Sequence, residues 1–164
     1  MSNIIIPDLN ELARFLVNAK RNAWAGDANE VEPTRPGFKR HVWKEGDWEY
    51  EDEYTGNYCP HGQEFVRLQG KPVWAMAYDG GMKEEYWGNR EYGEYIFGHL
   101  KKALLLVTED RPFRGPSIYE EGDLSYHCAV DGDIKRFLGR ELITDDRGEP
   151  FKVFSQNCIG GLII

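Results

Sequence analysis

The chain has 164 residues, of which 41% are hydrophobic and 29% are charged, a composition typical of one soluble globular domain. Its formal net charge of −8 excludes the basic surface that direct nucleic-acid binding requires, and an anionic membrane surface would repel it. No apolar run approaches the roughly 18 residues of a membrane span, and the opening MSNIIIPDLNE lacks the basic region of a signal peptide.

Two segments carry apolar residues at the spacing of a helix. The first is 8–20, where Asp8 and Glu11 have the spacing of a capping box with aspartate at the cap. The second is about 91–107, with Asn89 as its N-cap. The apolar faces are formed by Leu9, Leu12, Ala13, Leu16 and Ala19 in the first segment, and by Ile96, Leu100, Ala103, Leu104 and Val107 in the second.

Between these helices the apolar period changes to two, which predicts β-strands. In 48–54, WEYEDEY, three aromatic residues and Asp52 alternate with Glu49, Glu51 and Glu53. We therefore expect a strand whose acidic face lies in water.

Further strands follow on both sides of the second helix. The stretch QEFVRLQGKPVWAMAY predicts a hairpin that turns at Gln69-Gly70. The segments LSYHCAV, IKRFLGRELIT and FKVFSQN predict antiparallel strands, joined by turns at Asp131-Gly132 and at 145–149. The segment 21–37 lacks periodicity and carries the turn-forming residues of a loop.

Part of the sequence is approximately repeated. The phrase EGDWEY, which begins at Glu45, returns as EGDLSY at Glu121, and GQEFV from Gly62 then matches GRELI from Gly139. The insertions needed for later matches fall near turns, which accept added residues at low cost. The alternative is that similar turns recur by chance in a β-rich chain. Further matched pairs are Gly46, Asp47, Tyr50 and Gly56 with Gly122, Asp123, Tyr126 and Gly132, Pro72-Val73 with Pro150-Phe151, Gly80-Gly81 with Gly160-Gly161, and Leu16 and Ala19 with Leu100 and Ala103.

We therefore predict one domain over residues 1–164 with two tandem repeats, about 8–82 and about 91–164, each a helix followed by a loop and about four strands. The fold class is then α+β. The two repeats are expected to pair into one antiparallel sheet about a pseudo-twofold axis, with both helices on one face.

The predicted repeats differ in chemistry on two strands. The first repeat places Asp52 on a strand face with aromatic residues, where a charge is costly without a partner. Small residues alternate along the last strand of that repeat and suit the side packed against a helix, so we expect Trp74, Met76 and Tyr78 to point away from it. The correspondences are Trp48, Tyr50, Asp52 and Tyr54 with Leu124, Tyr126, Cys128 and Val130, and Trp74, Met76 and Tyr78 with Lys152, Phe154 and Gln156.

These differences indicate an aromatic and acidic cleft in the first repeat that binds a small organic ligand. Asp52 and Glu64 would be its polar anchors, while Trp48, Trp74 and Tyr78 would stack on the ligand. The alternative is that the same residues form a core and a dimer interface. The candidate ligand-binding residues are Trp48, Tyr50, Asp52, Tyr54, Glu64, Trp74, Met76, Tyr78, Arg35 and Arg114.

Two pairs of equivalent charged residues also have structural explanations. Glu64 and Glu141 occupy matching positions, and a glutamate present in both halves more often pairs with an arginine or holds a loop than performs chemistry. Arg35 in RPG and Arg114 in RGP precede the first strand of each half. Arginine in such a rigid loop clamps a carboxylate or phosphate, or it bonds loop carbonyls, and we slightly favour the structural role.

Cysteine and histidine give no strong catalytic or metal signal. Cys59 and His61 are too close in sequence to presume a catalytic geometry, and His127 and Cys128 would face opposite sides of a strand. Zinc-site spacings are absent, and no phosphate-binding loop is found, so we expect no catalytic residues, no metal and no cofactor. His41 is expected on the surface of a strand. Because three cysteines are an odd number, we expect reduced thiols and a cytoplasmic protein.

The motifs RPG, GDWEYEDEY, GQEFV, GKPVWAMAY, RGP, YHC and GREL together resemble a bacterial domain family of unknown function, over nearly the whole chain. That family occurs as a standalone protein and as the C-terminal part of helix-turn-helix regulators, so the resemblance implies an effector-sensing role. We expect no helix-turn-helix segment before this chain, so a regulatory output would have to come from a partner protein. The chain departs from the family pattern at Ala77, where asparagine is expected, and at Ile159, where a histidine often precedes the paired glycines. The residues on the pattern are Arg35, Pro36, Asp47, Tyr50, Asp52, Tyr54, Gly56, Glu64, Pro72, Trp74, Met76, Tyr78, Arg114, Gly115, Pro116 and Glu141.

The leading functional hypothesis is a non-enzymatic domain that binds a small organic effector and is linked to transcriptional regulation. The second is a protein-interaction or homodimerisation module that uses the same aromatic face, with a second copy or a regulatory protein as its partner. The third is a hydrolase or other enzyme that uses Asp52, Glu64 or a Cys/His pair. None of these hypotheses involves direct contact with nucleic acid or a membrane.

Overall fold

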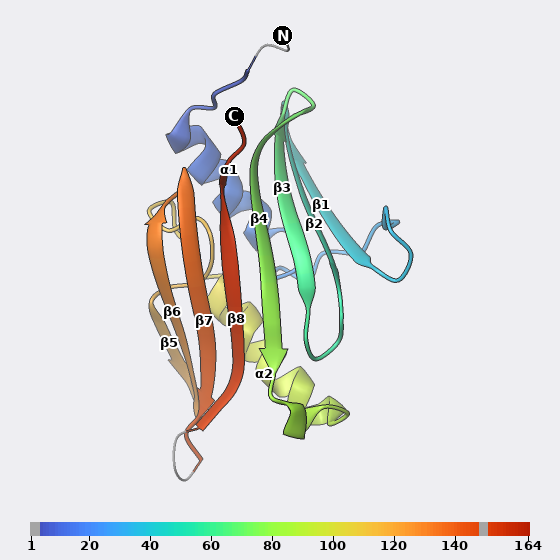
Figure 1. Cartoon of the computed structure of the whole chain (residues 1–164), viewed down its shortest axis with the longest axis vertical. Coiled ribbons are helices and arrows are strands. Elements are labelled where there is room, and N and C mark those ends of the chain that lie inside the picture. Colours follow the sequence, from blue (N-terminus) through green and yellow to red (C-terminus); the bar gives the residue numbers. More distant parts are fainter. Residues whose placement is uncertain (1–3, 148–150) are drawn as a thin grey trace.

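The computed structural model describes residues 4–147 and 151–164, which form one sheet and two helices (Figure 1). Residues 148–150 lie outside the described residues, and with them the end of the predicted turn at 145–149 and the matched Pro150. The elements in chain order are α1 (Leu9–Arg21), β1 (Lys39–Glu45), β2 (Trp48–Thr55), β3 (His61–Leu68), β4 (Lys71–Met82), a 3-10 helix η1 (Glu84–Tyr86), α2 (Arg90–Leu104), β5 (Ile118–Glu121), β6 (Leu124–Asp133), β7 (Arg136–Asp145) and β8 (Phe151–Leu162).

The eight strands form a single antiparallel sheet in the order β1-β2-β3-β4-β8-β7-β6-β5. The predicted α+β class with an antiparallel sheet is confirmed. β4 and β8, the last strands of the two predicted repeats, pair with each other at the centre, while the duplication and the pseudo-twofold axis stay predictions. Within the described part of the chain, neither helix is long and apolar enough to cross a membrane.

Both helices begin at the predicted caps. The carboxylate of Asp8 accepts hydrogen bonds from the backbone N–H groups of Asn10, at 2.9 Å, and Glu11, at 3.0 Å. The side-chain oxygen of Asn89 accepts from the backbone N–H of Tyr92 at 3.1 Å. These bonds satisfy N–H groups that have no partner inside the helix.

The end of α2 is held by α1. Arg21, in the last turn of α1, donates from Nε to the carbonyl oxygen of Leu105 at 3.3 Å and from Nη2 to that of Val107 at 2.8 Å. After Leu105 the backbone N–H groups of Leu106 and Val107 bond to carbonyls three residues back, so α2 ends at Leu104 and not at the predicted residue 107.

Both helices cover the same face of the sheet, behind the strands as viewed in Figure 1. Fully burying a large apolar side chain contributes about 1.5–3 kcal/mol, so this face is the main source of stability. α1 contributes Leu12, Phe15, Leu16 and Ala19 to a core with Tyr50, Val66 and Trp74, and α2 contributes Ile96, Leu100 and Ala103 to a core with Tyr126, Ile143 and Phe154.

The orientation that we predicted for β4 is wrong. Trp74 and Met76 are buried in the core that contains α1, so they point toward the helices. The large side chains fill the space between helix and sheet, and the small Ala75 and Ala77 are only half-buried. Val73 is also buried, because the β3-β4 pairing shifts there and inserts it as a bulge.

The predicted alignment of β4 with β8 is also wrong, by two residues. Val66 pairs with Trp74 and Ile143 pairs with Phe154, each beside a register shift, so the positional counterpart of Trp74 is Phe154 and not Lys152. The counterparts of Met76 and Tyr78 are likewise Gln156 and Cys158.

The acidic face of β2 does not lie in water as we expected. Glu51 and Glu53 are buried in ion pairs on the sheet face opposite the helices. Glu51 contacts Arg40 at 2.9 Å and Arg67 at 3.3 Å, whereas Glu53 contacts Arg35 at 2.8 Å. Arginines on the two neighbouring strands and in the loop therefore cover these carboxylates.

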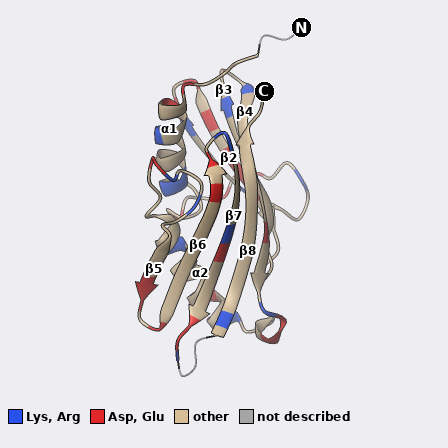
Figure 2. Cartoon of the chain, turned by 60° about the vertical axis from the view of Figure 1, so that its left-hand side comes forward, with Lys and Arg blue, Asp and Glu red and all other residues tan. Residues whose placement is uncertain are grey.

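The central strands β4 and β8 carry few charges (Figure 2).

Glu53 also binds the loop that precedes β1. Its carboxylate accepts the backbone N–H of Thr34 at 2.5 Å and the Nε–H of Arg35 at 2.9 Å. Burial by itself would raise the pKa of Glu53, but these hydrogen bonds outweigh it and hold the pKa at about 2. The ionised carboxylate therefore stabilises the loop at neutral pH.

We predict that Glu53→Gln lowers the free energy of unfolding by about 1–3 kcal/mol at neutral pH, because it weakens several charge-assisted hydrogen bonds. Glu49→Gln on the same strand face is the control, since Glu49 is partly exposed and should cost less than about 1 kcal/mol. Stability from Glu53 is present above the unfolded pKa of a glutamate and is lost as the pH falls toward about 2. Urea unfolding of both variants measures the difference, and equal losses would contradict the assignment.

Candidate functional site

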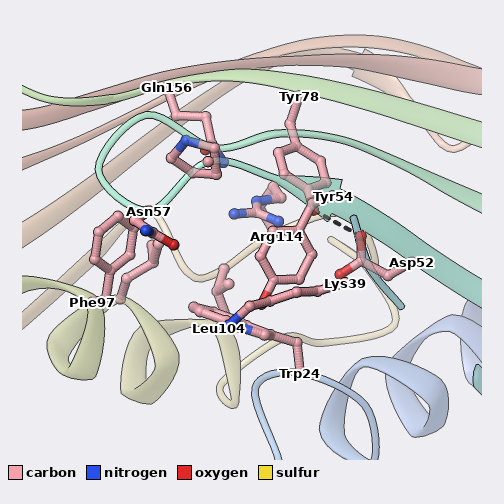
Figure 3. A pocket seen from close by; sticks show the side chains of 13 residues that line it. Trp24, Lys39, Asp52, Tyr54, Asn57, Tyr78, Phe97, Leu104, Arg114 and Gln156 are labelled. Carbon is pink, nitrogen blue, oxygen red and sulfur yellow. Dashed lines mark hydrogen bonds between the residues drawn. The ribbon is translucent and has the colours of Figure 1, made fainter. Parts of the chain in front are cut away.

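A cavity of about 180 Å³ lies between the helix-facing side of the sheet and the helix α2 (Figure 3). Aromatic and aliphatic side chains form most of its wall, and polar side chains from several elements reach into it. Both halves of the chain contribute, whereas we predicted a cleft in the first half with Arg114 as its single candidate residue from the second half. The lining residues are Trp24, Lys39, Asp52, Tyr54, Gly56, Asn57, Pro60, Tyr78, Phe97, Leu100, Leu104, Arg114 and Gln156.

The structure brings together six of the predicted site residues. Four of them, Asp52, Tyr54, Tyr78 and Arg114, line this cavity. A smaller cavity of about 30 Å³ shares Asp52 and Arg114 and is also lined by the predicted residues Tyr50 and Glu64, together with Lys20.

The other four predicted residues lie elsewhere. Trp48 stacks on Phe15 of α1, with ring centroids 5.3 Å apart. Trp74 is fully buried and donates its indole N–H to the carbonyl oxygen of Ile134 at 3.0 Å, and Met76 is buried in the same core. Arg35 binds Glu53 on the opposite sheet face.

Several lining residues were not predicted. Trp24 lies in the loop after α1, where no periodicity marks a residue as inward-facing. Phe97 lies on α2 outside the predicted apolar stripe. Gln156 shares one face of β8 with the buried Phe154 and Cys158, and this two-residue period is the signal that could have found it.

Asp52 is positioned by Tyr78. The Tyr78 hydroxyl donates to Asp52 Oδ1 at 2.7 Å. This contact depends on Gly62, because a Cβ atom at that position would come within 2.3 Å of the Tyr78 phenol. A residue with no side chain on β3 thus lets a ring on β4 reach a carboxylate on β2.

A buried group of opposite charges borders the cavity. Arg114 donates from Nε to Glu141 Oε1 and contacts Glu141 Oε2 through Nη2, both at 2.9 Å. Its Nη1 lies 3.7 Å from Glu64 Oε1, and Glu64 also binds the ammonium group of Lys20 from α1. Of the two structural explanations that we gave for these glutamates, holding a loop or pairing with an arginine, the structure shows the pairing with an arginine.

Gln156 completes the group of hydrogen-bond donors around Glu141. Its Nε2 donates to Glu141 Oε2 at 3.2 Å, and the Tyr126 hydroxyl donates to Glu141 Oε1 at 2.5 Å. The Oε1 atom of Gln156 is buried and has no hydrogen-bond partner among the described residues. An acceptor is therefore left unsatisfied on a side chain that lines the cavity.

The pKa of Asp52 is raised to about 7, first by burial and then by repulsion from Glu64. The hydrogen bond from Tyr78 and the charges of Lys20 and Arg114 oppose this rise without cancelling it. Burial likewise raises the pKa of Tyr78 well above its ordinary value. Asp52 therefore changes its charge near neutral pH, which is common at functional sites.

The thiols and histidines do not form a comparable site. Burial raises the pKa of Cys158 to about 12 and also raises that of Cys128, so both stay protonated at neutral pH. His61 contacts the exposed Asp79 at 3.0 Å. His41 is buried and not at the surface as we expected, because the segment after α1 covers β1. In residues 4–147 and 151–164, no three His, Cys, Asp or Glu side chains are placed to hold a metal ion.

Comparison with known proteins identifies one family. A family model described as a domain of unknown function (DUF5680) matches residues 52–163, more than half of the chain. The match begins at Asp52 and includes Tyr78, Arg114 and Gln156, whereas Trp24 and Lys39 precede it. No curated protein and no solved structure matches the chain. The predicted resemblance to a family of unknown function is thus confirmed, while its bacterial origin and its link to helix-turn-helix regulators stay predictions.

We predict that Asp52→Asn stabilises the protein by about 2 kcal/mol at pH 8, because it removes a buried charge that has too few partners. Since the folded pKa is raised, the stability that Asp52 contributes is present below its unfolded pKa and is lost as the pH rises toward about 7. The variant and wild type should therefore differ little near pH 4. Urea unfolding at several pH values tests this, and a gap that is constant with pH would contradict it.

We predict that Arg114→Met destabilises the protein by about 3–5 kcal/mol, because it leaves Glu64 and Glu141 close together without their shared cation. Arg140→Met is the control, since Arg140 is exposed on the same strand as Glu141 and should cost no more than about 0.5 kcal/mol. The measurement is urea unfolding at neutral pH. Similar losses for both variants would show that the buried pairs do not support the fold.

Proposed function

The chain belongs to the DUF5680 family of domains of unknown function, and we propose from the geometry of its cavity that it binds a small organic ligand there. The ligand would lie among the aromatic side chains of Trp24, Tyr54 and Phe97, beside Asp52. This keeps the hypothesis of a binding domain but moves the site from the first half to the junction of both halves.

One observation carries the proposal. The wall of the cavity is mainly apolar and aromatic, yet the buried polar groups of Asp52 and Gln156 reach it with hydrogen-bonding capacity to spare. Pockets for small molecules combine apolar walls with a few oriented polar groups in this way. A cavity of about 180 Å³ is large enough for a small ring compound.

A protein-interaction or dimerisation role for the same aromatic face has less support. Tyr50, Trp74 and Met76 are buried beneath α1 within the chain, so a partner cannot reach them without displacing that helix. A ligand of cavity size needs no such displacement.

Acid–base catalysis is the second candidate function, and the pKa of Asp52 near 7 favours it. A carboxyl group of that pKa in a cavity exchanges a proton at neutral pH. Binding is preferred because the adjacent Glu64 and Glu141 are engaged in ion pairs and the buried thiols stay protonated. The effector role, the link to transcriptional regulation and the cytoplasmic location stay predictions.

The proposal is tested by screening a library of small metabolites for compounds that raise the melting temperature and change tryptophan fluorescence. A true ligand should lose its fluorescence signal in Trp24→Phe, because Trp24 lines the cavity, and keep it in the control Trp87→Phe. Trp87 is 52% exposed and donates its indole N–H to the carbonyl oxygen of Met82. A screen without a stabilising compound, or equal responses of the two variants, would refute the site.

A further inference from the structure

We infer that the cavity selects an organic cation, such as an amidine, that places its charge on Asp52. This inference rests on the proposed binding function and adds the chemical class of the ligand.

Gln156 presents an acceptor and not a donor. Its Nε2 is 3.2 Å from the carboxylate of Glu141, which can only accept when ionised. Turning the amide over would place its oxygen against that carboxylate, so the hydrogen-bond network fixes Oε1 as the atom without a partner. Because Gln156 is 3% exposed, water from the bulk does not easily satisfy this atom, and a separate donor at the far end of a longer ligand would.

Asp52 presents a second acceptor. Within the described residues, Tyr78 is the group that donates to it, and this bond uses Oδ1. An ionised carboxylate accepts more than one hydrogen bond, so the other oxygen is available to a ligand donor. The carboxyl group is 6% exposed and lines both cavities.

The charge balance favours a cation. Lys20 and Arg114 are matched by Glu64 and Glu141, so these four charges cancel. An ionised Asp52 adds one unpaired negative charge to this buried group. A cationic ligand neutralises that charge, and aromatic walls attract cations as well.

The same arrangement disfavours an anion. The guanidinium of Arg114 is directed to Glu141 and Glu64 and is not free to bind a ligand carboxylate. The other cation of the lining, Lys39, pairs with Glu30 at 3.3 Å and is half exposed. An anion would therefore meet Asp52 without a buried cation of its own.

Binding of a cation is expected to be coupled to the loss of a proton from Asp52. The charged and titratable groups around Asp52 are Tyr50 and Tyr54 on β2 itself, Lys20 on α1, His41 on β1, Glu64 on β3, Tyr78 on β4 and Arg114 in the segment after α2. Burial lowers the pKa of His41, so that ring is largely neutral where Asp52 titrates. The affinity for a cation should rise with pH up to about 7 and then level off.

The test compares three planar compounds of nearly the same shape: benzamidine, benzamide and benzoate. Isothermal titration calorimetry at pH 8 should show benzamidine binding at least about tenfold more tightly than the neutral and anionic compounds. Asp52→Asn should weaken benzamidine about tenfold and remove the pH dependence, while the control Asp79→Asn, an exposed acid on β4, should change neither. Titrations of wild type near pH 6, in two buffers of different ionisation enthalpy, should show release of close to one proton.

Three outcomes would overturn the inference: tighter binding of benzamide or benzoate, no binding of benzamidine, or binding of benzamidine without proton release. The first and the second leave the proposed binding function standing if the metabolite screen yields ligands that respond through Trp24. If that screen also yields none, the binding function itself fails. The proton count of the wild type tests the inference independently of the Asp52→Asn variant.

Discussion

Arg114 is the buried charge on which the arrangement of the site depends. Its guanidinium binds Glu141 on β7 and approaches Glu64 on β3, so one side chain fixes carboxylates from both halves of the sheet. A buried arginine is tolerated only with such partners. Gln156 donates a further hydrogen bond to Glu141, and Lys20 forms an ion pair with Glu64. The orientation of each of these groups around the cavity therefore follows from the position of one guanidinium.

The buried carboxylates of this fold differ in how completely they are partnered. Asp145 is bound by Arg147, and its other contacts help to hold its pKa at about 2 despite burial. Glu53 is held in the same way by the loop before β1. Among the described residues, Asp52 receives a hydrogen bond from Tyr78 alone and lies close to the negative Glu64, and its pKa moves in the opposite direction. The partners of these carboxylates thus separate Asp52, the candidate site residue, from Glu53 and Asp145, although all three are buried.

Local signals predicted the helices and most strands, because caps and apolar periods act within a few residues of each other. The caps at Asp8 and Asn89 are examples. Long-range pairing could not be predicted in the same way. We expected the acidic face of β2 to be exposed to solvent, because the sequence does not reveal that Arg40 and Arg67 lie on the strands beside it. The counterpart of Trp74 was misplaced because a bulge has no clear signature in a single sequence. Asp52, Tyr54 and Tyr78 were found from the unusual composition of their strands, whereas Trp24 and Phe97 come from a loop and a helix that the tertiary fold brings to the cavity.

The hydrogen bonds from Arg21 to the carbonyls after α2 have a mechanical consequence. Leu104 lines both cavities and is the last residue of α2. The next residue, Leu105, accepts a hydrogen bond from Arg21 through its carbonyl oxygen. Any displacement of Leu104 would therefore also strain the two hydrogen bonds from Arg21. The end of α1 and the cavity wall at Leu104 are in this way mechanically coupled.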